Sequence, residues 1–520
     1  MTKEQKDNLF QLVKSLTKSE KRQFKLFVGR LGVNADSKFL NLFNLLDKSN
    51  TYDEPAIIKT GIVKKQQLAN VKAHLYKQIL ISLKLNPSHQ NIRSQIREQL
   101  DFASILYHKG LYKQGLRILE KAKELAIQNE EKNLAFEIVE LEKIIESQFI
   151  TRSISTRADE LTSQAKELSE LNVITSKLSN LSLQLYSMIL KSGYVKNKEE
   201  AQKITTYFNE RLPIFDISEV GFREKFWLYN SYLWRCFLLQ DFLNCYKYAL
   251  KWVNLFYDYP HMISLNPVFF LKGNNYLLEA LFFIRRKPRF LKQLHNLEKQ
   301  LQHPDFPKDE NVEALVFLYL NFHRINQHFI DGSFDEGLNL IPRIENKLNK
   351  FDSRLDEHHK MIFYYKFASM QFGAGNNKAC IFYLDKIISN KSLSMREDLQ
   401  CFARVLNLVA HYEAGLDYHL ESLLKSTYKF LIKINDLYKV QKEMIKFIKG
   451  LQDIYPHDLK NAFIELHKTL KTYEDHPYER RAFLYLDIIS WLESKIENKS
   501  VGQVIRDKYL AETASRSMKK

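Results

Sequence analysis

The chain has 520 residues and a mass of 61.7 kDa, and 45% of its residues are hydrophobic and 27% charged, which excludes a generally disordered protein. It contains only 15 Gly and 11 Pro, about 5% of the chain against a usual share of about 12%, so we expect an all-α fold. The 78 Lys and Arg outnumber the 61 Asp and Glu, which gives a net charge of +17 and favours acidic partners.

The basic character is concentrated near the N-terminus. Residues 1–97 hold 18 of the Lys and Arg but only 7 of the Asp and Glu. From Ile58 to Arg97 there are eight basic residues and no acidic one. Such a stretch attracts polyanions, so we treat residues 1–97 as a small basic helical domain.

Two amphipathic helices are predicted within this domain. Thr17-Lys18-Ser19-Glu20 has the spacing of a capping box and predicts a helix start after a break near Leu16. A second helix is predicted from about Lys65 to Leu85, ending at Asn86-Pro87. Basic side chains flank the apolar stripes of both helices, and the candidate polyanion contacts are Lys18, Lys21, Arg22, Lys25, Lys64, Lys65, Lys77 and Lys84.

The second of these helices allows two interpretations. Residues 56–62, followed by the helix at 66–80, loosely resemble two helices joined by a glycine turn, as in a DNA-binding helix-turn-helix. A helical bundle with a solvated basic face explains the same residues without a ligand. Both interpretations remain open.

From about Glu98 the sequence repeats as paired amphipathic helices. The clearest copies are Leu106–Leu116 and His328–Leu338, each with a Gly turn, an aromatic residue two positions later and a small residue three further on. Weaker copies, with turns 40 to 48 residues apart, centre on Gly193, Gln240, Pro288, Gly375 and Gly415. A degenerate copy is expected near residues 145–175.

The two clear copies resemble tetratricopeptide repeats. The resemblance rests on Gly110, Tyr112, Gly115 and Ala122 in one copy, and on Gly332, Phe334 and Gly337 in the other. Two departures are the longer period, compared with roughly 34 residues, and the absence of most of the Pro residues expected between repeats. The resemblance implies a right-handed α-solenoid over residues 98–510, with a concave groove lined by the first helix of each pair. Residues 511–520 lack an apolar anchor and are predicted to be a mobile tail.

The phase of the motif places eight side chains in the groove: Asn230, Phe237, Phe322, Asn326, Phe329, Tyr365, Ser369 and Phe372. Asn at such a place can hold a peptide backbone because its amide both donates and accepts hydrogen bonds. The alternative is that the aromatic residues among them pack between helices as core. The layout of a helical N-terminal module before such repeats is similar to that of peptide-sensing tetratricopeptide regulators.

No catalytic motif is found, and we expect neither an enzyme nor a cofactor or metal site. Asp356-Glu357-His358-His359 would point around a helix rather than converge on a metal. The basic turn Arg285–Arg289 is a solvated loop or a phosphate contact. Cys236, Cys245, Cys380 and Cys401 are predicted to be buried and unpaired.

We expect a cytoplasmic protein. The first ten residues are charged where a signal peptide needs an apolar run, and no stretch approaches a membrane span. Two functions are weighed. The first is a scaffold or regulator that binds a protein or peptide in the groove, and the alternative is a regulator that binds DNA or RNA through residues 1–97.

Overall fold

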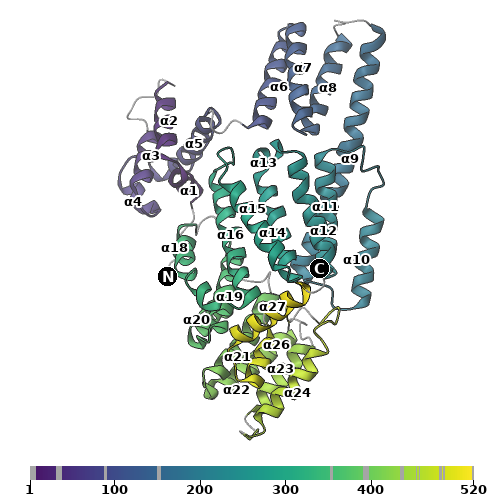
Figure 1. Cartoon of the computed structure of the whole chain (residues 1–520). Helices are drawn as coiled ribbons and strands as arrows, with labels where there is room; N and C mark the ends of the chain where they lie inside the picture. The colour runs from purple at the N-terminus through teal and green to yellow at the C-terminus, as the bar shows by residue number, and fades with distance from the viewer. Residues whose placement is uncertain are drawn as a thin grey trace. The chain divides into compact units, whose positions relative to one another are not determined.

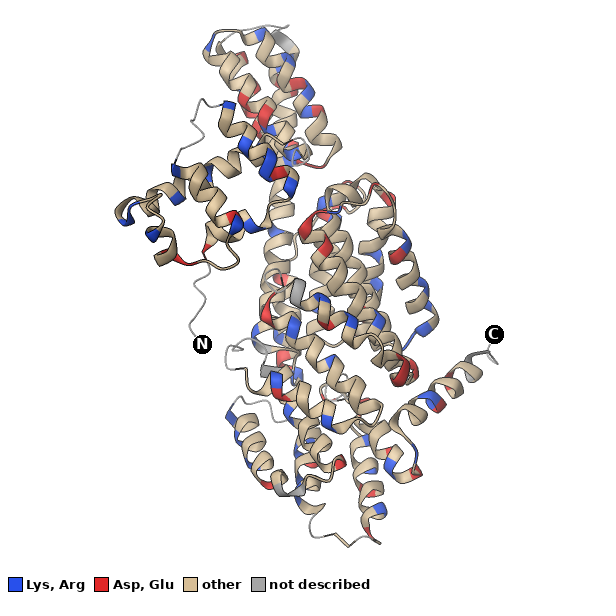
Figure 2. Ribbon diagram, turned by 90° about the vertical axis from the view of Figure 1, so that its left-hand side faces the viewer, with Lys and Arg blue, Asp and Glu red and all other residues tan. Residues whose placement is uncertain are grey.

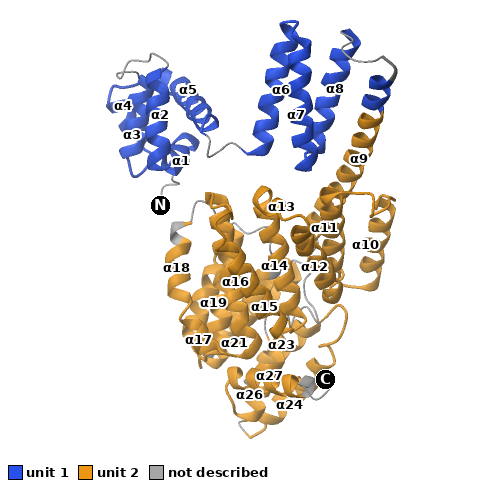
Figure 3. Cartoon of the chain, turned by 45° about the horizontal axis from the view of Figure 1, so that its top comes forward, with its two compact units in different colours: residues 1–162 blue, residues 163–520 orange. Residues whose placement is uncertain are grey.

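The computed structural model describes residues 7–30, 38–86, 91–148, 154–351, 355–390, 397–433, 439–451, 454–455, 457–479, 483 and 487–517. Throughout these residues the regular structure is helical and contains no strand, which confirms the all-α class (Figure 1). The chain forms two compact units, residues 1–162 and 163–520 (Figure 3). None of the described helices is both long and apolar enough to cross a membrane.

The first unit begins with a five-helix bundle. Its helices are α1 (Asn8–Ser15), α2 (Lys18–Arg30), α3 (Lys38–Lys48), α4 (Glu54–Lys59) and α5 (Lys65–Lys84). The predicted capping box is present, since the Thr17 N–H donates to Glu20 Oε2 at 2.7 Å and the Glu20 N–H donates to Thr17 Oγ1 at 3.2 Å. The predicted break near Leu16 and the helix at 65–85 are confirmed. Buried residues of all five helices form one core that includes Leu9, Phe24, Phe43, Ile57 and Leu75.

The rest of the first unit contains α6 (Ile92–His108), α7 (Tyr112–Gln128), α8 (Lys132–Gln148) and the first residues of α9 (Ile154–Ser192). The turn between α6 and α7 contains Gly110 with φ of 73°, as the repeat motif predicts. A hairpin near residues 145–175 was also expected. Over Ile154–Ser192 this prediction is wrong, because α9 runs through that range without a turn, and residues 149–153 lie outside the described part.

A buried charge cluster joins α7, α8 and α9. The Lys123 Nζ donates to Glu142 Oε2 at 2.6 Å, and the Arg157 Nη2 donates to Glu142 Oε1 at 3.2 Å. Glu142 is 1% exposed. Because a buried carboxylate is stable only when its charge is balanced, this cluster fixes the relative register of the three helices.

The second unit continues α9 and adds helices in pairs. Their bounds are α10 (Lys198–Arg211), α11 (Phe222–Leu238), α12 (Phe242–Asp258), α13 (His261–Leu265), α14 (Pro267–Phe283), α15 (Lys287–Leu301), α16 (Glu310–Asp331), α17 (Phe334–Leu338), α18 (Ile341–Lys350), α19 (Glu357–Gly373), α20 (Asn377–Ile388), α21 (Glu397–Glu413), α22 (Asp417–Lys433), α23 (Lys439–Gly450), α24 (Leu459–Lys471), α26 (Ile488–Glu497) and α27 (Val501–Ser517). Helix α27 continues into the stretch predicted as a mobile tail, and residues 518–520 lie outside the described part.

Successive hairpins of this unit share one turn. Each contains a residue with left-handed backbone, and these residues are Gln240, Arg285, Gly332, Gly375 and Gly415. At Gly375, for example, its N–H donates to the Phe372 carbonyl at 3.0 Å and the next N–H donates to the Gln371 carbonyl at 2.8 Å. The copy predicted at Pro288 is shifted, because its left-handed residue is Arg285 and Pro288 lies in the first turn of α15. The structure therefore repeats helical hairpins with the predicted spacing.

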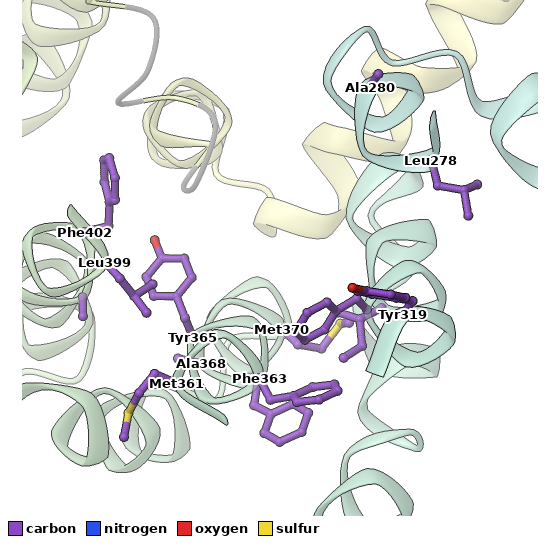
Figure 4. Packing of buried hydrophobic residues seen from close by; sticks show 14 of the residues in the cluster. Leu278, Ala280, Tyr319, Met361, Phe363, Tyr365, Ala368, Met370, Leu399 and Phe402 are labelled. Atoms are coloured by element: carbon purple, nitrogen blue, oxygen red, sulfur yellow. The ribbon is translucent and has the colours of Figure 1, made fainter. Parts of the chain in front are cut away.

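Small residues allow the hairpins to pack closely. A Cβ atom at Gly373 would lie 2.5 Å from the Phe334 ring, and one at Gly337 would lie 2.6 Å from the Met370 sulfur. The core continues between neighbouring hairpins, where Figure 4 shows Tyr365 of α19 beside Leu399 and Phe402 of α21. All four cysteines are buried and none forms a disulfide, as predicted.

Candidate functional site

Most of the side chains predicted to face a groove lie in the helical core. Asn230, Phe237, Phe322, Asn326, Tyr365 and Phe372 are only 3–8% exposed, and Phe329 and Ser369 are half-buried. Phe322, for example, packs on Phe363 with 4.5 Å between ring centroids. Most of these eight side chains therefore pack between helices rather than facing an open groove.

The two asparagines predicted to face the groove accept hydrogen bonds from side chains of neighbouring helices. The Ser182 hydroxyl of α9 donates to Asn230 Oδ1 at 2.8 Å, and the Lys366 ammonium of α19 donates to Asn326 Oδ1 at 2.5 Å. A third link of the same kind joins Asn275 of α14 to His323 of α16, with 2.9 Å between Oδ1 and Nε2. Polar side chains thus connect successive hairpins inside the unit.

Three of the predicted groove residues do line a cavity. Phe329, Ser369 and Phe372 lie on the wall of a cavity of about 150 Å³ between α14, α16, α17 and α19 on one side and α27 on the other. Other aromatic residues that line it are Phe282, Phe283, Phe334, Phe483 and Tyr509. Charged groups at its border include Arg285, Asp487, Lys508 and Glu512. Phe334, Phe372 and Gly373 also line a second cavity, of about 480 Å³, together with Gln503 and Arg506 of α27.

The aromatic wall follows from the repeat. Three residues before each left-handed turn residue the chain has an aromatic side chain, and the series is Phe237, Phe282, Phe329, Phe372 and Tyr412. Its three central members line the cavity. Sequence reasoning missed Phe282 because the turn of that hairpin was placed at Pro288 rather than at Arg285. Aligning the copies on the aromatic residues would have found it.

Three polar residues lie on α16 and α19, two of the helices that supply the aromatic wall. The Ser369 hydroxyl is buried and has no hydrogen-bond partner among the described residues, and the same holds for Nδ1 of His323. Burial lowers the pKa of the Lys366 ammonium to about 8. Burial and the nearby Lys366 charge lower the pKa of His323 to about 3, so its ring is neutral at pH 7. Of these residues only Ser369 lines the cavity, where its hydroxyl can donate or accept a hydrogen bond.

The basic residues predicted in the N-terminal bundle are mostly solvent-exposed. Seven of the eight are exposed and have no ion-pair partner within the described ranges, namely Lys18, Arg22, Lys25, Lys64, Lys65, Lys77 and Lys84. Lys21 differs, because it is half-buried and its Nζ lies 2.7 Å from Asp47 Oδ1. On α2, Leu26 is 58% exposed among the basic side chains. Figure 2 shows Lys and Arg along this bundle with few Asp and Glu between them.

Two other motifs have structural roles. Asp356 caps α19, since its Oδ1 accepts from the His359 N–H at 2.8 Å. Arg285 lies at the left-handed turn with its Nη2 3.6 Å from Asp487 Oδ2. In the described residues, no group of three or more His, Cys, Asp and Glu side chains is arranged to hold a metal ion.

The tetratricopeptide resemblance in the two clear copies rests on local sequence and turn geometry alone. Comparison with protein-family models finds no matching family, and comparisons with curated proteins and with solved structures find no significant match.

Proposed function

We propose that this chain is a non-enzymatic, cytoplasmic scaffold or regulator, built as a tetratricopeptide-like solenoid, that binds a protein or peptide on the inner surface of its repeats. The observation that carries the proposal is the aromatic cavity lined by Phe329, Ser369 and Phe372. It lies on the first helices of successive hairpins, where repeats of this kind bind their ligands.

The size and chemistry of the cavity favour a macromolecular partner. Pockets for small molecules usually enclose about 300–1,000 Å³, whereas this cavity has about 150 Å³. It has room for one or two side chains. Aromatic walls suit an apolar side chain, and the hydroxyl of Ser369 supplies a polar group that can orient a bound chain.

The test fills the cavity by enlarging one side chain of its wall. Ser369→Phe adds a ring where the Oγ is buried, while Ser389→Phe makes the same change at an exposed residue at the end of α20, the second helix of the same pair. Both full-length variants and the unaltered chain are affinity-purified from their own cells after nuclease treatment. We expect Ser369→Phe alone to lose the proteins that co-purify. Equal recovery by all three chains would refute the proposal.

A second function is favoured by one observation in the first unit. Seven exposed basic side chains of α2, α5 and the turn before α5 lack ion-pair partners in the part of the bundle that the structure describes, and α5 contains no acidic residue. We propose, as the alternative, that this bundle binds DNA or RNA phosphates. Neutralising about six phosphates predicts that log affinity falls with log salt at a slope of about −4 to −5.

The test is titration of the full chain with labelled duplex DNA and with labelled RNA at several salt concentrations. Replacing Lys18, Arg22 and Lys25 by Gln should weaken binding and reduce the slope, whereas the same change at exposed Lys429, Lys433 and Lys442 should leave both unchanged. A slope near zero would rule this function out.

A further inference from the structure

The C-terminal helix α27 approaches α16 more closely than side chains normally allow. A Cβ atom at Gly332 would lie 2.3 Å from the backbone oxygen of Gly502, and one at Gly502 would lie 3.0 Å from the oxygen of Gly332. The atom added at Gly502 would also lie 3.2 Å from the ring of Phe334, which lines the cavity. Helix α27 therefore lies backbone to backbone on the turn between α16 and α17 (Figure 1).

One face of α27 closes the cavity. Its lining residues are Val501, Ile505, Lys508, Tyr509 and Glu512, whose spacing places them on a single side of the helix. This is how an amphipathic helix binds in a groove of a partner. The cavity is thus already covered by a helix of the same chain.

Polar contacts of two residues, Lys508 and Tyr509, hold the C-terminal half of this face in place. The Lys287 ammonium of α15 lies 4.5 Å from the centroid of the Tyr509 ring, which is within range for a cation–π interaction. Lys508 donates to the Ser490 hydroxyl at 2.9 Å and pairs with Glu493 of α26. The contacts of Lys508 join α27 to the core helix α26, so they must break when α27 leaves the cavity while α26 stays in place.

The fit of α27 is incomplete, and its connection permits movement. About 150 Å³ stays unfilled between α27 and the aromatic wall, whereas helix contacts inside a folded protein are close-packed. Only Lys499 and Ser500 separate α27 from α26, and the preceding Asn498 has left-handed backbone with φ of 54°. The neighbouring residues Gln503 and Arg506 are exposed and line the second cavity together with Gly332. Ile505 of α27 belongs to the core of this unit, so a ligand that replaces α27 must supply an apolar side chain at that place.

We propose that α27 is an internal ligand that keeps the cavity closed, and that the partner is an amphipathic helix of another protein that displaces it. This inference rests on the proposed protein-binding function. The residues of α27 that contact the cavity and the turn after α16, here called the seat of α27, indicate the sequence that the partner helix needs. It needs a small residue where the backbones touch, an aliphatic residue three positions later and an aromatic residue four positions after that. In α27 these positions are Gly502, Ile505 and Tyr509.

The experiment uses the full chain and a fluorescent peptide with the sequence of residues 499–517. Two variants weaken the seat. Gly502→Leu introduces a side chain at the backbone contact, and its control is Ala511→Leu at an exposed position of the same helix. Tyr509→Ala removes the cation–π contact and part of the cavity wall, and its control is Leu510→Ala, at a residue that is 56% exposed. Hydrogen exchange of residues 501–514 reports whether α27 has detached.

We expect both seat variants to lose protection over 501–514 and to bind the peptide at least about tenfold more tightly than the unaltered chain, because the internal competitor is gone. Both controls should match the unaltered chain. Detachment without tighter peptide binding would overturn the inference, and so would protection that persists in both variants. If Ser369→Phe loses its co-purifying proteins and either of these two results is also obtained, the proposed protein-binding function stands. Only the proposal that α27 is an internal ligand is then rejected.

Discussion

Replacement of Gly332 by Ala should detach α27, and Gly415→Ala provides a matched control. Both glycines have left-handed backbone, with φ of 69° and 67°, so an alanine at either position costs roughly 1–2 kcal/mol of backbone strain. Their surroundings differ. The new Cβ at position 332 would lie 2.3 Å from the Gly502 oxygen, whereas nothing lies within 4 Å of the new Cβ at position 415.

The difference between the two variants isolates the contact with α27. An ordinary contact of this kind is no shorter than about 3.4 Å, so the backbone of α27 must shift by about 1 Å or separate. Overpacking of this type costs about 1–3 kcal/mol, which corresponds to an opening equilibrium of α27 that is about 5- to 150-fold larger in Gly332→Ala.

Hydrogen exchange measured residue by residue over 501–514 gives this equilibrium directly, and it avoids assuming two-state unfolding for a chain with two units. We expect faster exchange there in Gly332→Ala and unchanged exchange in Gly415→Ala. Equal exchange of α27 in the two variants would show that the close contact with Gly502 is absent, and the argument for the internal ligand would lose its basis.

Three further predictions concern stability. Because the pKa of His323 is lowered to about 3 in the fold, unfolding takes up a proton below the ordinary pKa of about 6.5, so stability should fall by about 2 kcal/mol between pH 7.5 and pH 5. Thermal melts at the two pH values should show this loss in the unaltered chain and a smaller one in His323→Gln; an identical loss in both would contradict the assignment. Glu142→Gln removes the buried carboxylate charge that balances Lys123 and part of Arg157, and should cost about 3–5 kcal/mol, while Glu140→Gln, at an exposed pair, should cost about 0.5 kcal/mol or less. Similar melting temperatures for these two variants would exclude the buried cluster. Thr17→Ala removes the cap of α2 and should cost about 1 kcal/mol, compared with almost nothing for exposed Ser19→Ala, as measured by chemical denaturation of the first unit.

The repeat was predictable where its turn requires glycine. Gly110, Gly332, Gly375 and Gly415 all have left-handed backbone, which few other residues adopt at low cost. Gln240 and Arg285 adopt the same conformation without being glycine, so the residue type does not mark these two turns. The turn at Arg285 is therefore predicted three residues too late, at Pro288. The long helix α9 was missed because its sequence has no residue that ends a helix, and the expected period overruled that observation.

The candidate site was harder to predict than the fold. An aromatic residue on the first helix of a hairpin can face a groove or the next helix, and periodicity does not distinguish these two cases. Phe322, Tyr365 and Phe372 are all buried, but only Phe372 lines the cavity, together with the half-buried Phe329 at the same position of the motif. Gly502 lies in a polar stretch, and its importance depends on a contact with Gly332, 170 positions earlier in the chain, that no local pattern encodes.

Photo-crosslinking from inside the cavity tests the protein-binding account most directly. Benzoylphenylalanine replaces Phe329, which lines the cavity, or Phe382, which is 56% exposed on α20 and serves as the control. Both full-length chains are irradiated in their own cells, and the cross-linked proteins are identified by mass spectrometry. The account predicts a defined partner protein cross-linked at position 329 but not at 382. Cross-links at 329 to α27 alone, or the same proteins at both positions, would contradict it.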